Sequence, residues 1–362
     1  FSVSAGAVAV FIACFYNFMI SGLSLEVNLW DPTTSYAENG YILSSAISIK
    51  YLVKKAPGGY SQAKIQEICY KYVDSEKVNL IDSIRAIRND KRDWANLRLL
   101  QEMCAHEPYG VSRLGDEESV QKITNHTLYR HGQQLMSTAR LELLYCGSAD
   151  VQRVEEAALQ AFAALPRGEM EELPEAQIIA APQSPRFVTE EMEVTQGKLT
   201  MGFRCGSDDA PAMVLANLLF GGSSNSKLFL NVREKLSLCY YASSAYARSK
   251  KILTVSSGIE PKDYDRTLDE ILHQLRQVQE GQWEPWELDG ARSTALNSLR
   301  SVADSQSALE NFYMSRAAVD QRETPEELMQ SLQAVTPERI CEAAESIQLD
   351  TVYFLRGKEA AQ

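Results

Sequence analysis

The spacing of apolar residues changes along the chain, and the changes predict a succession of strands and helices. Apolar residues recur every three or four positions through 61–104, which predicts one long helix. Further helices are predicted at 116–123, 127–136, 149–164, 210–220, 227–235, 262–280, 285–318, 324–332 and 336–346. Shorter extended apolar runs predict strands at 41–49, 141–146, 198–205, 238–247, 252–259 and 352–355.

Two halves of the chain repeat this order of elements. Ile123-Thr124 stands 212 residues before Val335-Thr336, and each pair lies between two short helical patterns. A stretch rich in Glu, Pro and Ala separates the halves. The pattern therefore predicts an N-terminal domain over 1–168, a linker over 169–186 and a C-terminal domain over 187–362. Counted back by one period, the first domain would start about 25 residues before Phe1, so we expect it to be incomplete at its start.

Composition narrows the class of protein. The 362 residues are 45% hydrophobic and 23% charged, which is typical of a globular protein and excludes disordered and collagen-like chains. A net charge of −12 argues against nucleic acid as a partner. The 7 cysteines form no CxxC pair and indicate reduced thiols, hence a cytoplasmic protein. The first 25 residues carry no charge, but polar residues interrupt them, so we expect buried structure and not a membrane span.

One segment carries a resemblance to a known family. Residues 226–240 read SKLFLNVREKLSLCY and follow the pair Gly221-Gly222. This segment is similar to the second-domain signature of the insulinase/pitrilysin (M16) metallopeptidases, in which SRLFxxVREKxGLxY follows a glycine pair. Residues 76–83 resemble the family's helix that brings the third zinc ligand. Residues 89–110 look like the bacterial YmfF-like subgroup of non-catalytic members.

The resemblance implies a fold and a metal chemistry. The implied fold is α+β: two repeated α/β sandwiches, each a mixed, mainly antiparallel sheet with helices on one side. Active members hold zinc with HxxEH and a distal glutamate, and this sequence contains no HxxEH. Glu76 matches the first of two glutamates on the zinc helix, but Ser83 stands where the second would bind zinc. We therefore expect no metal and no cofactor in this chain, with zinc in a partner subunit.

Two further residues are implied to contact substrate. Arg233 and Tyr240 match the arginine and tyrosine that reach the peptide in active relatives. A guanidinium and a phenol can donate hydrogen bonds to a peptide carbonyl. Alternatively, Arg233 pairs with a neighbouring acid and Tyr240 packs on the sheet, and Tyr241 competes for the tyrosine role.

The resulting hypothesis is a non-catalytic subunit that pairs with a zinc-carrying paralogue to process peptides. A dimer with a second copy of itself is the other expected partnership. Neither nucleic acid nor membrane is an expected partner. Two alternatives stay open. The chain could be an active zinc peptidase whose HxxEH lies upstream of residue 1, since the repeat places that motif near the start of the sequence. It could also be a purely structural subunit that resembles the core proteins of a respiratory complex.

Overall fold

The computed structural model describes residues 19–20, 23–24, 62–140, 144–145, 148, 150–163, 167–170, 178–317 and 319–358. The chain divides into two compact units, Phe1–Ala86 with Ser112–Glu175, and Ile87–Val111 with Ala176–Gln362. The strand predicted at 41–49 lies outside the described residues, and the one at 141–146 does so almost entirely. The domain boundaries of the sequence stay a prediction, but residues 87–111 pack with the C-terminal half.

The first unit contains a two-residue ladder and helices. Strands β1 (Met19–Ile20) and β2 (Leu23–Ser24) pair antiparallel. The helices are α2 (Gln62–Asn89), which ends in the second unit, α4 (Glu117–Lys122), α5 (Asn125–Thr138) and α6 (Val151–Ala163). Helix α4 begins where Asp116 accepts a hydrogen bond from the Ser119 backbone N–H at 2.8 Å. Lys77 on α2 donates to the backbone oxygens of Gln121 and Ile123, both at 2.8 Å, and so ties α2 to the end of α4.

The prediction of one long helix over 61–104 is wrong in one respect, because the segment forms two helices, α2 and α3. Helix α3 (Lys91–Met103) starts anew at Asp90, whose carboxylate accepts from the backbone N–H groups of Arg92 at 2.9 Å and Asp93 at 3.1 Å. The prediction at 285–318 likewise divides into α9 (Pro285–Arg300), η6 (Ser301–Asp304) and α10 (Gln306–Ala317). Apolar periodicity continues through both breaks, so it could not reveal them.

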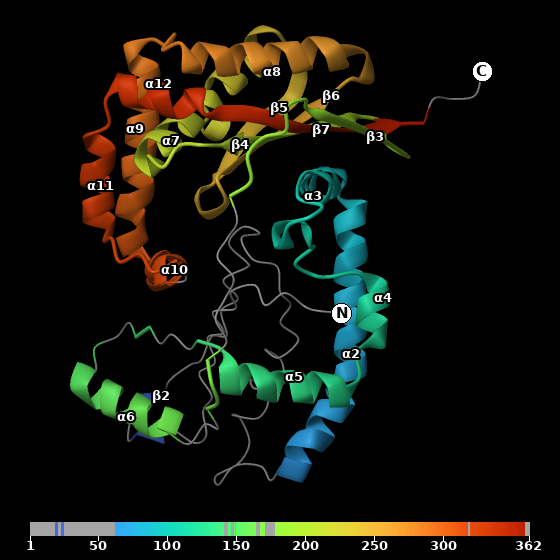
Figure 1. The fold of residues 1–362 in the computed structure, drawn as a ribbon, viewed down its shortest axis with the longest axis vertical. Helices are drawn as coiled ribbons and strands as arrows, with labels where there is room; N and C mark the ends of the chain where they lie inside the picture. Colours follow the sequence, from blue (N-terminus) through green and yellow to red (C-terminus); the bar gives the residue numbers. More distant parts are fainter. Residues whose placement is uncertain are drawn as a thin grey trace. The chain divides into compact units, whose positions relative to one another are not determined.

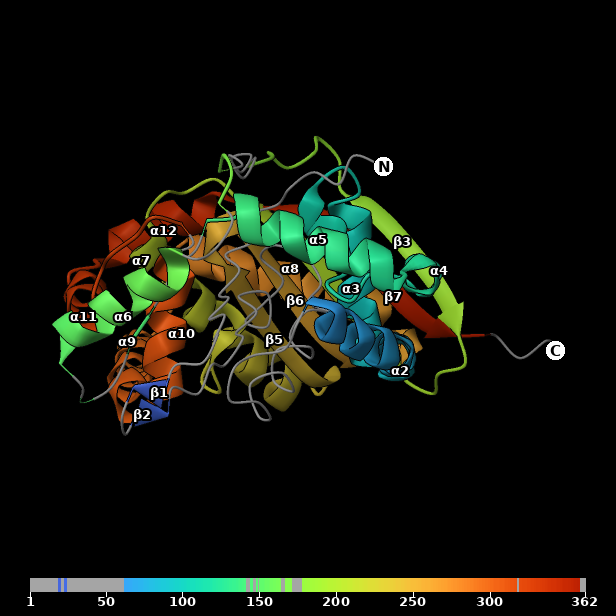
Figure 2. The same ribbon diagram turned by 90° about the horizontal axis from the view of Figure 1, so that it is seen from below.

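The second unit is built on a five-stranded sheet in the order β3-β7-β4-β6-β5. Its strands are β3 (Arg186–Met192), β4 (Gly197–Cys205), β5 (Cys239–Ala247), β6 (Ile252–Ile259) and β7 (Ile347–Gly357). Only β3 and β7 are parallel, so the sheet is mixed and mainly antiparallel, as expected (Figure 1). The edge strand β3, beside β7 in Figure 2, was missed because its RFVTEEM sequence is mostly polar.

One face of this sheet carries the main core. Apolar side chains of alternate strand positions, such as Met201 and Phe203, pack beneath the helices. Those helices are α7 (Ala210–Asn217), α8 (Tyr264–Gln279), α9, α11 (Pro325–Gln333) and α12 (Pro337–Glu345), as Figure 1 shows. The predicted α+β fold, a mixed and mainly antiparallel sheet with a layer of helices, is confirmed for this unit.

Helix α3 lies on the opposite face, which the sequence did not predict. Ala95 and Leu99 of α3 pack against Tyr353 of β7. The helix approaches so closely that a Cβ on Gly202 of β4 would lie 2.5 Å from the Met103 sulfur. The sheet of the C-terminal half is therefore covered on its second face by a helix from the N-terminal half of the sequence.

Candidate functional site

The two glycines of the signature lie where the backbone comes into close contact with Asn217 and with Ser244 of β5. Gly221 and Gly222 end η2 (Leu218–Gly222), a π-helical continuation of α7. A Cβ on Gly221 would stand 2.8 Å from the Ser244 backbone nitrogen, and one on Gly222 would stand 2.6 Å from the Asn217 amide. Larger residues would push this turn away from β5. The pair therefore sets the position of the segment that follows.

A buried ion pair holds that following segment against α9. Lys227, just before η3 (Leu228–Lys235), lies 3.2 Å from a carboxylate oxygen of Glu287. Both side chains are buried, and the second oxygen of Glu287 accepts the Glu284 backbone N–H at 2.7 Å. Lys227 stands where the family signature has arginine, and in this chain the position serves packing and not substrate contact.

Ser237 occupies the glycine position of the signature. Its φ of 51° is in the left-handed region, where glycine is free of the strain that a Cβ introduces. We predict that Ser237→Gly stabilises the protein by about 1 kcal/mol, measured as the change in the free energy of urea unfolding. Ser237→Ala is the control and should give no gain, because it keeps the Cβ; a gain from alanine would contradict the strain argument.

Tyr240 projects from an irregular point in the edge strand β5. Cys239 pairs with Ile259 of β6, and Tyr241 pairs with Gly258, which is adjacent to Ile259. Tyr240 therefore has no partner of its own and is the extra residue of a β-bulge. Tyr240 is 59% exposed, and its hydroxyl donates a hydrogen bond to Glu260 at 2.8 Å. That hydrogen bond and the charge of Glu260 raise the pKa of Tyr240. The phenol is therefore protonated and accessible from solvent.

Arg233 is also accessible. Its Nε lies 3.5 Å from a carboxylate oxygen of Glu234, and its guanidinium stacks over the Phe229 ring at 4.7 Å. Both charged side chains are exposed, and such surface pairs contribute little to stability. Glu234 is thus the neighbouring acid with which the alternative interpretation paired Arg233. Because this pair is exposed, the guanidinium can still bind another partner.

Tyr241 faces the covered side of the sheet. Its ring lies beneath the Arg92 guanidinium at 4.4 Å, with the Lys198 ammonium 5.8 Å from the ring centre. The ring also passes so close to Gly258 that a Cβ there would lie 2.6 Å from it. Tyr241 therefore joins the start of α3 to the sheet, whereas Tyr240 faces solvent.

Glu76 and Ser83 stand on α2 in the first unit, whereas Arg233 and Tyr240 belong to the second. The Ser83 hydroxyl donates to the Asn79 backbone oxygen at 2.8 Å, and Glu76 accepts from the Asn79 side-chain amide at 3.2 Å. Asp82, the nearest carboxylate in sequence, lies 3.9 Å from Arg85. At the position that the resemblance assigns to the distal zinc ligand, Ser83 presents a neutral hydroxyl engaged by its own helix, and such a hydroxyl fits zinc poorly.

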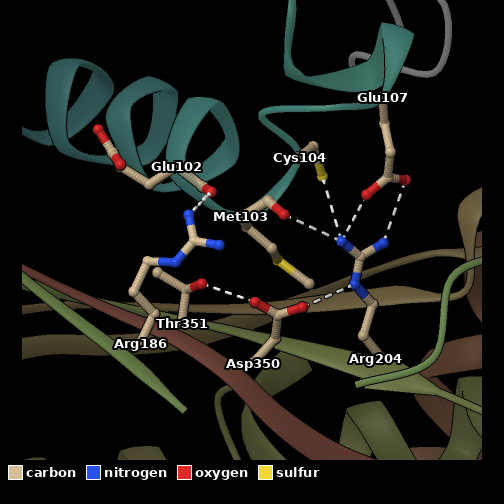
Figure 3. Close-up of polar contacts among 8 residues, drawn as sticks. All are labelled: Glu102, Met103, Cys104, Glu107, Arg186, Arg204, Asp350 and Thr351. Atoms are coloured by element: carbon tan, nitrogen blue, oxygen red, sulfur yellow. Dashed lines mark hydrogen bonds and ion pairs between the residues drawn. The ribbon is translucent and has the colours of Figure 1, made fainter. Parts of the chain in front are cut away.

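A buried charge cluster, which the sequence analysis missed, anchors the segment after α3 (Figure 3). Arg204 of β4 donates through Nη2 to Glu107 at 2.5 Å and to the Met103 backbone oxygen at 3.1 Å, and through Nε to Asp350 at 2.9 Å. The three charged side chains are only 6–7% exposed. Burial alone would lower the pKa of Arg204, but the hydrogen bonds to Glu107 and Asp350 raise it.

The cluster is structural and not a nucleophilic site. Burial, with the charge of Glu107, raises the pKa of the neighbouring Cys104 thiol to about 12, so the thiol stays protonated. The sequence holds one indication of this cluster, namely Arg204 inside the apolar run 199–205. An arginine is unusual in a strand that is covered on both faces.

No described helix is long and apolar enough to cross a membrane. Within the same ranges, no three His, Cys, Asp or Glu side chains gather as a metal site would require.

The mixed sheet with its helical layer defines the fold of the M16-like peptidases, and comparisons with known proteins agree. A family model described as "Peptidase M16 inactive domain" matches residues 122–295. A Bacillus subtilis (strain 168) protein named "Probable inactive metalloprotease YmfF" is 35% identical over 297 residues, which are 80% of this chain and 69% of that protein. The chain therefore belongs to the M16 peptidase family and is a homologue of its inactive metalloproteases.

Solved structures extend the likeness. A conserved protein from Enterococcus faecalis V583 is 25% identical with a TM-score of 0.70, covering 85% of this chain and 72% of that one. A peptidase M16 inactive domain from Pseudomonas fluorescens is 20% identical with a TM-score of 0.64, covering 82% and 74%. A chain of Complex III2 from Candida albicans is 16% identical with a TM-score of 0.62, covering 81% and 75%. The last two show the fold alone.

Proposed function

We propose that this chain is a non-catalytic subunit of an M16-type peptidase, which pairs with a zinc-carrying paralogue to process peptides. The observation that carries the proposal is Ser83, whose hydroxyl is bonded within its own helix at the position of the distal zinc ligand. A zinc-bearing partner would supply the metal and its activated water. The four cysteines within the described ranges, Cys104, Cys205, Cys239 and Cys341, form no disulfide, which supports a cytoplasmic location for this assembly.

The role proposed for this chain is to hold the peptide. Arg233 and Tyr240 are both exposed, and both carry donors that suit a peptide carbonyl oxygen. Donors placed at such an oxygen are most effective when negative charge develops on it during the reaction. The lone accessible tyrosine at the bulge is better placed for this than Tyr241, which lies beneath Arg92.

A purely structural role is the second candidate. The fold likeness to a chain of Complex III2 from Candida albicans favours it, since that chain carries the same fold as part of a larger assembly. The two candidates differ in one respect: a structural subunit needs no accessible Arg233 or Tyr240.

We predict that Arg233→Ala and Tyr240→Phe each lower the peptide-cleavage rate of the mixed assembly about tenfold or more, because each removes a donor to the reacting carbonyl. The assembly is prepared by co-purifying the chain with its paralogue, and cleavage is assayed for each subunit alone and mixed. Arg266→Ala, an exposed arginine on α8, is the matched control and should leave the rate unchanged.

Three outcomes would contradict the proposal. Stoichiometric zinc in this chain alone would contradict the non-catalytic role. Cleavage that is the same with and without this chain would contradict the pairing. Full activity of both variants would remove the proposed contact with substrate and favour the structural role.

A further inference from the structure

Positive charge gathers in the second unit where the hairpin between β5 and β6 approaches the end of α10. The turn of this hairpin is η4 (Arg248–Lys250), which carries two cations, and Arg316 is the second-last residue of α10. Burial lowers the pKa of Arg316, and the charge of Arg248 lowers it further, so the two guanidinium groups lie close enough to repel each other. The chain as a whole has a net charge of −12, so this excess of positive charge is local.

Arg316 lacks most of the acceptors that a guanidinium requires. Its guanidinium stacks on the Phe312 ring at 3.6 Å, and its Nη1 donates to the Phe312 backbone oxygen at 3.4 Å, which is long for a hydrogen bond. Its Nε is buried and, in the part of the chain that the structure describes, donates to nothing. A buried donor in this state raises the free energy of the folded protein until an acceptor reaches it.

The hairpin turn contributes two more groups of the same kind. Lys250 is 7% exposed and its ammonium lies 5.7 Å from the Tyr109 ring centre, but within the described ranges no carboxylate is at ion-pair distance from it. The hydroxyl of Ser249 is buried and has no hydrogen-bond partner among the same residues. Buried cations in proteins are ordinarily paired, because an unpaired charge is costly to transfer from water.

Glu323 supplies the one described carboxylate at ion-pair distance from any of these three cations. Both Nη atoms of Arg248 lie 3.5 Å from the same oxygen of Glu323, whose side chain is 43% exposed. Lys251, the next residue of the hairpin, has its own partner in Asp208. Three cations against one carboxylate leave two positive charges without a counterion.

We propose that Arg248 and Arg316, together with Ser249 and Lys250 of the turn, form a binding site for a dianionic phosphate group. Such a group carries the two negative charges that the cluster lacks, and its oxygens accept hydrogen bonds from guanidinium, ammonium and hydroxyl donors. A single carboxylate would carry half that charge. The phosphate group could belong to free phosphate or to a small phosphomonoester. This site follows the last residue of β5, whereas Tyr240 stands near the first, so the inference does not depend on the proposed function.

The test measures the melting temperature of the full chain in about 5 mM sodium phosphate at about pH 8, where phosphate is a dianion. Sodium chloride of equal ionic strength is the reference, and acetate and phosphoserine are the other two probes. The wild-type chain should melt about 2–4 °C higher in phosphate than in chloride, because a ligand of the folded state stabilises it. At this low concentration the general exclusion of phosphate from protein surfaces contributes little.

Substitutions then assign the response to the cluster. Arg248→Gln changes a partly exposed residue and should weaken phosphate binding about tenfold. Arg316→Met keeps a contact with the Phe312 ring and should also lose the response. In chloride this variant should be no less stable than the wild type, because it removes a buried donor without an acceptor. Arg276→Gln removes an equal charge from the exposed face of α8 and should keep the full response.

Several outcomes would overturn the assignment. Phosphate could shift the wild-type chain no more than chloride does, or acetate could shift it equally; either result excludes a site for a phosphate dianion. If Arg248→Gln and Arg316→Met both keep the response, or if Arg276→Gln loses it, phosphate acts elsewhere or through net charge. An equal response to phosphoserine supports the site and identifies a phosphomonoester as its ligand, whereas a response to inorganic phosphate alone supports a site that encloses the free ion.

Discussion

Replacement of Arg204 by methionine is expected to lower the free energy of unfolding of the second unit by about 3–5 kcal/mol. Methionine replaces the aliphatic part of the arginine side chain but carries no charge, so Glu107 and Asp350 would stay buried without their cation. The Met103 backbone oxygen would also lose its donor. Urea unfolding followed by circular dichroism measures the loss.

The control for this prediction is Arg356→Met on the same sheet. Arg356 pairs with Glu191 at 2.7 Å, but both side chains are more than a third exposed, so the loss should be below about 1 kcal/mol. Hydrogen exchange adds a local readout: in Arg204→Met, protection should fall first in 91–110, which Arg204 holds against the sheet. If the two variants lose equal stability, Arg204 is not the anchor of that segment.

A second replacement separates charge from packing in this cluster. The triple change of Arg204, Glu107 and Asp350 to apolar residues of similar volume should recover part of the stability, since buried ion pairs seldom contribute more than well-packed apolar groups. Residues 87–111 would keep their other contacts with the sheet, among them the packing of Ala95 and Leu99 and the hydrogen bonds of Trp94 and Arg98 to Glu190. Such a recovery would show that the charged cluster selects one docked position for this segment more than it adds net stability.

The sequence predicted best those helices and strands that a short segment determines by itself. The apolar runs at 198–205 and 252–259 predicted β4 and β6, and the periodicity at 324–332 predicted α11, because the physical cause lies within a few residues. Asp90 shows the opposite case. Its capping role was readable from residue type, but the periodicity on both sides concealed that it separates two helices.

The site was only partly predictable for a related reason. Resemblance named Arg233 and Tyr240, but only the strand register shows that Tyr240 is the bulge residue and Tyr241 is its covered neighbour. Arg204 could not be connected to Glu107, because 97 residues separate them and neither periodicity nor composition reports such contacts. The hydrogen bond from Tyr240 to Glu260 was likewise not predictable, because the two residues stand 20 positions apart in the sequence.

Replacement of Lys227 by methionine is expected to have the second large effect, a loss of about 3–5 kcal/mol, because the buried Glu287 carboxylate loses its cation. The effect should also reach the substrate residues. Lys227 precedes η3, which carries Arg233, and Glu287 fixes the start of α9 by accepting the Glu284 N–H. A shift of η3 would displace Arg233 and the strand that follows it.

Two measurements distinguish this from a simple loss of stability. At a temperature where Lys227→Met is fully folded, peptide binding should still be weakened, because Arg233 is misplaced. The double variant Lys227→Met/Glu287→Gln removes the unpaired charge but keeps an acceptor for the Glu284 N–H, so it should regain stability and binding together. If it regains stability while binding stays weak, the ammonium of Lys227 itself takes part in holding the peptide, and the packing role assigned to this signature position is wrong.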